Sequence, residues 1–74
     1  MNPIVEKTKE IITLLGFPHA EVALDEERRK VIVLIDDRFV SDNVETILPA
    51  MDHVINTVLK KAGLIPHVVD LNYY

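Results

Sequence analysis

The side chains best suited to acid–base or metal chemistry in this chain are three histidines and twelve carboxylates. A catalytic or metal site needs such groups at a spacing that brings them together, for example two histidines one turn apart on a helix. His19, His53 and His67 show no such spacing. Asp52 directly precedes His53, but neighbours on a helix point about 100° apart. Asp36-Asp37 is better explained as the end of a strand, so we expect no enzyme, no metal site and no cofactor.

Positively charged side chains could instead hold the phosphates of a nucleic acid. Arg38 is the best single candidate for contact with a phosphate or with a carboxylate of a partner. Ser41 and Asn43 follow it closely and could donate hydrogen bonds. The remaining cations are also consistent with a solvated turn or with the negative end of a helix dipole. The candidate contacts with RNA or a partner are Arg28, Arg29, Lys30, Arg38, Ser41, Asn43, Lys60 and Lys61.

The size and charge of the chain narrow the choice of function. Its 74 residues form one domain at most, and the lack of cysteine excludes disulfides. Twelve acidic residues against eight basic ones give a net charge of −4. Nucleic-acid-binding domains are usually basic, although a basic cluster on one face counts for more than the sum. No apolar run has the length of a membrane span, so we expect a soluble cytoplasmic protein without membrane contact.

The first half of the sequence predicts a helix followed by a hairpin. Asn2 is a favoured helix cap, Pro3 fits the first helical position, and Gly16 ends the helix. The hairpin comprises a strand at Val22–Leu24, a charged turn at Asp25–Arg29 and a second strand at Val31–Ile35. This second strand is apolar on both faces, which is typical of a strand that is covered on both sides or central in its sheet.

The strongest helical pattern lies in the second half of the chain. Apolar residues recur at steps of three and four over residues 44–59, and Gly63 ends the helix. Pro49 lies inside this pattern and removes one helical hydrogen bond. The helix therefore either kinks at Pro49 or is divided into a short helix at about 42–47 and a longer one that begins near Pro49.

The predicted order is helix, strand, strand, helical segment and strand, with residues 66–71 as the last strand. The hairpin pairs the first two strands antiparallel, and the helical crossover brings the third strand parallel to the second. We therefore predict an α+β fold whose three-stranded mixed sheet carries its helices on one face. The outer edge of the third strand could pair with another copy or another protein.

This order of elements resembles a type II KH domain, and the residues resemble the KH domain of the bacterial Jag family, which usually precedes a second RNA-binding domain. The similar pieces span nearly the whole chain: Ile11–Phe17, Glu21–Val31, Glu45-Thr46, Ala50–Lys61 and Val68–Tyr73. The resemblance implies that residues 1–74 form a single KH-like domain that binds single-stranded RNA without catalysis, alone or in a ribonucleoprotein. Because the chain ends at Tyr74, where the family continues, we expect an independent domain.

The chain departs from this family in the segment with which the family binds RNA. The family's Gly-x-x-Gly loop lets the backbone approach phosphates, whereas this chain has Ser41-Asp42-Asn43-Val44 there. Val44 would crowd that approach, and Asp42 would repel phosphate. Asp42 and Glu45 are also spaced for a helix capping box. Residues 35–45 are fewer than in the family, which leaves room for the small helix before the loop to be missing.

Two functions follow. The domain binds single-stranded RNA weakly or only within an assembly, or it is a protein-interaction or dimerisation module on a KH scaffold that has lost RNA binding. Phe39, Tyr73 and Tyr74 could stack on bases or pack against a partner. The positions of the cations discriminate between the hypotheses, because RNA binding needs them on one surface. The cations to compare are Arg28, Arg29, Arg38, Lys60 and Lys61.

Overall fold

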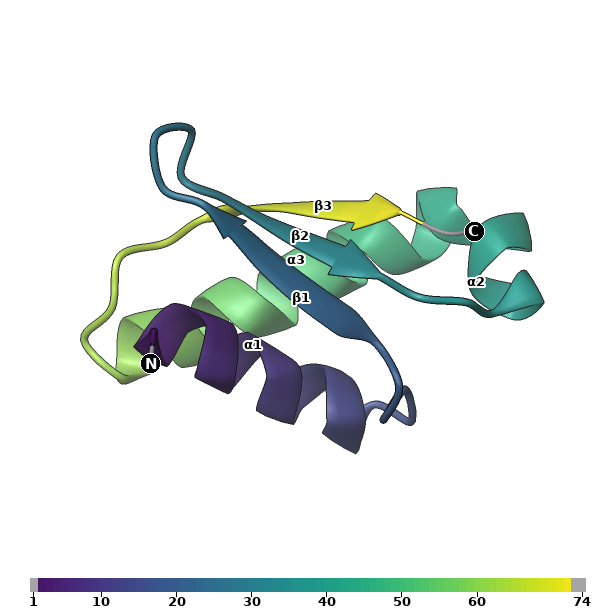
Figure 1. Cartoon of the computed structure of the whole chain (residues 1–74), viewed down its shortest axis with the longest axis horizontal. Coiled ribbons are helices and arrows are strands. Elements are labelled where there is room, and N and C mark those ends of the chain that lie inside the picture. Colours follow the sequence, from purple (N-terminus) through teal and green to yellow (C-terminus); the bar gives the residue numbers. More distant parts are fainter. Residues whose placement is uncertain (1, 73–74) are drawn as a thin grey trace.

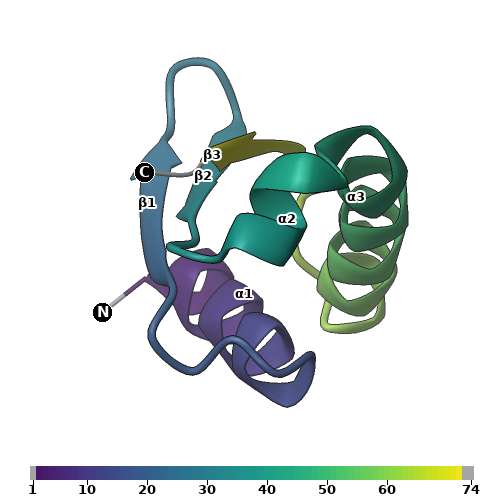
Figure 2. The same cartoon turned by 90° about the vertical axis from the view of Figure 1, so that its right-hand side faces the viewer.

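The computed structural model describes residues 2–72. Its elements are α1 (Pro3–Leu14), β1 (Glu21–Asp25), β2 (Lys30–Leu34), α2 (Arg38–Asp42), α3 (Val44–Lys61) and β3 (Val68–Asn72). The strands form one sheet in the order β1-β2-β3, in which β1 is antiparallel and β3 parallel to β2. In Figure 1 α1 lies below the sheet and α3 passes behind it, and Figure 2 shows both helices on the same side of the sheet. The predicted α+β fold with a mixed three-stranded sheet is therefore confirmed.

The core is a single layer between the sheet and the helices α1 and α3. On β2, Val31 and Val33 point toward the helices and are fully buried. The fully buried apolar residues that the two helices contribute are Ile12, Ile55 and Leu59. On the other face of β2, Ile32 and Leu34 are half-buried. The apolar strand is therefore central in its sheet, as one of the two explanations predicted, but helices cover only one of its faces.

Both predicted glycine stops are present, and the cap of α1 is as expected. The Asn2 side chain accepts a hydrogen bond from the Ile4 N–H at 2.8 Å, which satisfies one of the free donors of the first turn. Gly16 has φ of +103° and Gly63 has φ of +75°, a region that glycine adopts without strain. After Gly63, the Leu64 N–H returns to the Leu59 carbonyl at 2.8 Å and closes the end of α3.

A short helix, α2, is present between β2 and α3, where a small helix was expected to be missing, and it includes Ser41 and Asp42. The Asp37 side chain caps α2 by accepting from the Phe39 N–H at 2.8 Å. Asn43 ends α2, because its Nδ2 donates to the Phe39 carbonyl at 2.8 Å. The predicted capping box of Asp42 and Glu45 is wrong: α3 begins at Val44 with Asn43 as its cap residue, and no side-chain hydrogen bond caps it.

Pro49 does not divide α3, which runs without interruption from Val44 to Lys61. Of the two alternatives, a division at Pro49 is therefore excluded, and the break in the helical segment falls at Asn43 instead. A proline inside a helix costs about 3 kcal/mol. Burial of Met51, Ile55 and Leu59 on one stripe outweighs this cost.

Even this longest helix does not have the length and apolarity needed to cross a membrane, and the same holds for the other helices of residues 2–72.

Polar side chains of α3 hold the beginning of β3 in place. Asn56 donates from Nδ2 to the His67 carbonyl at 2.7 Å and accepts from the His67 N–H at 2.8 Å. One turn earlier, the Asp52 carboxylate accepts from the Val69 N–H at 3.2 Å. These contacts join residues that are 11 and 17 positions apart in the sequence. They satisfy backbone groups that an edge strand would otherwise leave without partners.

We expect the substitution Asn56→Ala to lower the free energy of unfolding by about 2 kcal/mol, since it leaves both backbone groups of the buried His67 without a partner. Urea denaturation would measure the change. Thr57→Ala is the matched control, because the Thr57 hydroxyl bonds only to the His53 carbonyl of its own helix. A loss below about 0.5 kcal/mol for Asn56→Ala would contradict a structural role of this contact.

Thr8 provides a second test of the core. Its Oγ1 is buried in α1 and has no hydrogen-bond partner among the described residues. We expect Thr8→Val to raise the free energy of unfolding by about 1 kcal/mol, because it replaces an unsatisfied hydroxyl with a methyl group of similar shape. The same substitution at the exposed Thr13 of this helix should change stability little. Equal effects at the two positions would show that burial of the hydroxyl carries no penalty.

Candidate binding surfaces

The candidate cations do not share one surface. Lys30 opens β2, with Arg28 and Arg29 in the turn before it, whereas Arg38 follows the other end of β2. Figure 1 shows the hairpin turn and α2 at opposite ends of the molecule. Lys60 and Lys61 lie at the end of α3. From there the chain leads to the start of β3, which pairs with Lys30 next to the hairpin turn. Arg38, Ser41 and Asn43 are therefore separated from the other candidates by the length of the sheet.

Three of these cations lie beside carboxylates. Arg28 Nε is 3.8 Å from Asp25 Oδ2, and Arg38 Nε is 3.9 Å from Asp42 Oδ2. Lys30 Nζ is 3.8 Å from Asp70 Oδ2. Exposed pairs of this kind add little to stability. They do reduce the positive potential that a phosphate would meet at these side chains.

The segment Ser41–Val44, which the resemblance compares with a Gly-x-x-Gly loop, forms the junction between α2 and α3. Ser41 lies in α2, and its N–H donates to the Asp37 carbonyl at 3.1 Å. The Asn43 amide group, predicted as a donor to a ligand, is used to close α2. Val44 is half-buried. The chain at this junction is therefore folded into two helix ends, without the glycines that would let a phosphate approach the backbone.

An apolar groove of ≈ 320 Å³ lies where the end of α1, α2 and the first half of α3 meet. Its lining residues are Leu15, Phe17, Phe39, Thr46, Ile47, Ala50, Met51 and Val54. Three of the large apolar side chains remain exposed to solvent: Phe39 at 64%, Leu15 at 47% and Val54 at 38%. Of the aromatic side chains predicted to be exposed, Phe39 is confirmed, whereas Tyr73 and Tyr74 lie outside the described residues.

The sequence contained a signal for this groove that the predicted site residues did not include. Leu15 extends the apolar stripe of α1 past its buried part, and Phe39 directly follows three charged residues, Asp36, Asp37 and Arg38. Each is unremarkable as a single exposed side chain. Only the packing of α1 and α2 against α3 brings them together into one apolar surface.

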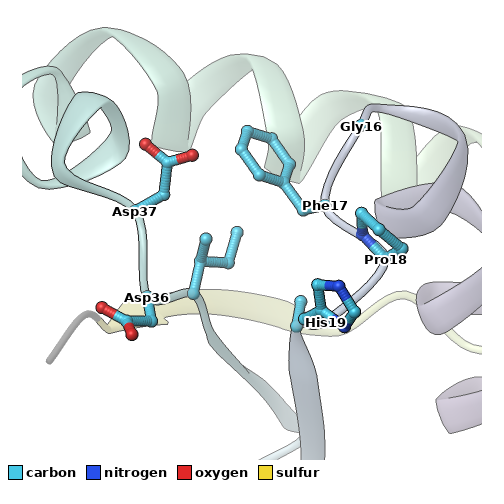
Figure 3. A pocket seen from close by; sticks show the side chains of 8 residues that line it. Gly16, Phe17, Pro18, His19, Asp36 and Asp37 are labelled. Carbon is cyan, nitrogen blue, oxygen red and sulfur yellow. The ribbon is translucent and has the colours of Figure 1, made fainter.

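A second pocket of ≈ 380 Å³ adjoins the groove at Phe17, which lines both. It lies between the loop Gly16–Ala20 and the segment Ile35–Asp37. In Figure 3 the Asp37 carboxylate points toward the Phe17 ring, whereas the Asp36 carboxylate points away from the His19 ring. The residues that the structure describes contain no group of three or more His, Cys, Asp or Glu side chains that could hold a metal ion. The acidic side chains give this pocket a negative character.

The outer edge of β3, predicted as a surface for pairing with another strand, is partly occupied. Asn56 and Asp52 already bind the outward-facing backbone groups of His67 and the N–H of Val69. A second strand would have to displace these contacts before it could pair with this part of the edge. The apolar groove is therefore the more accessible of the two surfaces for a protein partner.

Comparisons of the chain with protein-family models, with curated proteins and with solved structures found no match. Any function proposed for this chain therefore rests on its own surfaces and on its order of elements.

Arg29 allows a test of whether the hairpin turn is built for stability or for contact. Its φ of +50° lies in the left-handed region, which costs a residue with a side chain roughly 1 kcal/mol. We expect Arg29→Gly to raise the free energy of unfolding by about 0.5–1 kcal/mol, as measured by urea denaturation. The neighbouring Arg28→Gly, without positive φ, should lower it. If Arg29→Gly destabilises the domain instead, the arginine side chain contributes contacts that outweigh its backbone strain.

Proposed function

We propose that this chain is a non-catalytic KH-like domain that acts as a protein-interaction module. The binding surface is the apolar groove between α1, α2 and α3. The observation that carries this proposal is the accumulation of exposed apolar side chains on one hollowed surface of a very small domain. Phe39 lies in α2, Val54 lies in α3 and Leu15 caps the end of α1, and all three face a common groove.

Leaving such an apolar surface in water costs free energy. A domain of this size buries only about 60% of the surface of its unfolded chain, so apolar side chains are scarce and are normally used in the core. Covering the exposed parts of Phe39, Leu15 and Val54 gains about 25 cal/mol for each Å² removed from water. A contiguous apolar surface with a hollow shape is typical of a site that another molecule covers.

Charge also favours a protein partner. The chain carries a net charge of −4, and its cations lie at both ends of the sheet. Arg28, Lys30 and Arg38 each have a carboxylate within 4.0 Å. These cations are scattered and partly neutralised. Because RNA binding needs cations on one surface, their arrangement favours a protein partner over RNA. A nucleic acid would meet no extended basic surface on the part of the domain formed by residues 2–72.

Weak or assembly-dependent binding of single-stranded RNA is the second candidate function. The observation that favours it is the order of elements, helix, strand, strand, helix, helix and strand, with a sheet in the order β1-β2-β3. This is the order expected for a type II KH domain, and α2 supplies the short helix before the loop position. Arg38 at the start of α2 is the cation best placed beside that loop.

The proposal predicts that peptides selected from a displayed library of helical sequences bind at the groove. The substitution Val54→Glu should abolish their binding, because it places a charge on the apolar lining while keeping a good helix former in α3. Amide chemical-shift mapping would locate the binding surface, and calorimetry would measure the affinity. Val68→Glu is the matched control, because Val68 is 60% exposed on the sheet, away from the groove.

The same protein would be titrated with labelled, mixed-sequence single-stranded RNA at low and moderate salt. We expect no binding in the micromolar range. Binding that weakens steeply with salt and is lost in Arg38→Glu would favour the RNA function instead. Peptides that bind equally well to wild-type and Val54→Glu protein would show that the groove is not the interaction surface.

A further inference from the structure

We infer that the partner segment is an amphipathic helix that carries a lysine or arginine beside its apolar face. The apolar face fills the groove, and the cation enters the adjoining pocket at Asp37, with Asp36 beside it. This inference rests on the proposed function and names the chemistry of the partner. It joins two surfaces that meet at one residue, Phe17.

The shape and chemistry of the groove favour a helix over an extended peptide. The residues that α3 contributes to it form one stripe from Thr46 to Val54, which is about 12 Å long at 1.5 Å per residue. This length matches about two turns of a bound helix, with apolar side chains at every third or fourth position. Apart from Thr46, the described lining side chains are apolar. They offer an extended backbone almost no hydrogen-bond partners, whereas a helix satisfies its own backbone groups.

The pocket beside the groove favours a cation at the end of that helix. Asp37 accepts one hydrogen bond with Oδ1, from the Phe39 N–H, and its carboxylate faces Phe17 in Figure 3. Arg38, the nearest cation in the sequence, is paired with Asp42. Among residues 2–72, the ion pairs of the structure involve neither Asp36 nor Asp37. The Asp37 carboxylate therefore remains to be matched by a cation that the partner supplies, whereas the Asp36 carboxylate points away from the pocket and adds only its charge nearby.

A second copy of the chain does not fit this site. It would have to present an exposed apolar helix face that ends in a cation. The last turn of α1, with its exposed Leu14, contains no basic residue. Lys60 and Lys61 end α3, but the apolar residues nearest to them on that helix are turned into the core or half-buried. Two copies with a net charge of −4 each would also repel one another.

The test uses three synthetic helical peptides of about 15 residues, long enough to form stable helical turns. They share one apolar face of Leu and Phe, and they carry Lys, Gln or Glu at the position next to that face. Circular dichroism confirms that the three are equally helical. We expect the Lys peptide to bind about fivefold more tightly than the Gln peptide, and the Glu peptide to bind most weakly. Raising the salt concentration should reduce this preference.

One double variant tests whether the two aspartates cause the preference for the Lys peptide, and a second double variant is its control. In Asp36→Asn with Asp37→Asn, the preference for the Lys peptide should disappear, while the Gln peptide binds as before. Asparagine at position 37 can still cap α2, so the fold is retained. The control removes the same charge elsewhere, by Glu26→Gln with Glu27→Gln, two exposed residues of the hairpin turn at the other end of β2. It should leave the preference intact.

The possible outcomes separate this inference from the proposed function. Equal binding of the three peptides at the groove would overturn the inference and leave the proposed function standing. Failure of all three peptides to bind would count against both. If light scattering shows a dimer that excludes the peptides from the groove, the occupant is a second copy and the inference is wrong. If single-stranded RNA binds in competition with the Lys peptide, the occupant is a nucleic acid, and the inference is likewise wrong.

Discussion

The packing of two helices against one face of a three-stranded sheet is the interaction on which the rest of this structure depends. Val31 and Val33 on β2 lie at the centre of that layer and are fully buried against α1 and α3. A chain of 74 residues can build only one such layer, so it determines which side chains are covered. α2 and the end of α1 lie at its margin, where Phe39 and Leu15 cannot reach the core and remain exposed. The groove is a consequence of this geometry.

Contacts between backbone and polar side chains then determine where the chain turns. Asn43 closes α2 and makes α3 a separate helix, which places Phe39 opposite the first half of α3. Asn56 and Asp52 join α3 to the start of β3 and occupy part of the sheet edge. Each of these contacts satisfies backbone groups that lack a partner in a helix or strand. Together they leave the groove, rather than the β3 edge, as the surface open to a partner.

The fold of this domain and the chemistry of its surface favour different ligands. The order of elements favours a KH-like domain, and this likeness alone would favour RNA. Among residues 2–72 the cations do not form one surface, since Arg38 lies at the opposite end of β2 from the hairpin cations and is paired with Asp42. Function follows from the groups that a ligand meets, and here these are apolar side chains beside two carboxylates. A partner that is apolar and basic satisfies both.

The sequence by itself determined the local signals of this fold. Asn2, Gly16 and Gly63 act through their own side-chain chemistry or backbone freedom, and the order of the strands follows from chain connectivity. Tertiary structure decided what depends on distant neighbours. Burial of the α3 stripe held Pro49 inside one helix. The amide of Asn43 closes α2 on the Phe39 carbonyl, so α3 begins after Asn43 rather than after Asp42. The groove could not be predicted, because its lining comes from α2, α3 and the residues after α1, whose relative positions no local pattern encodes.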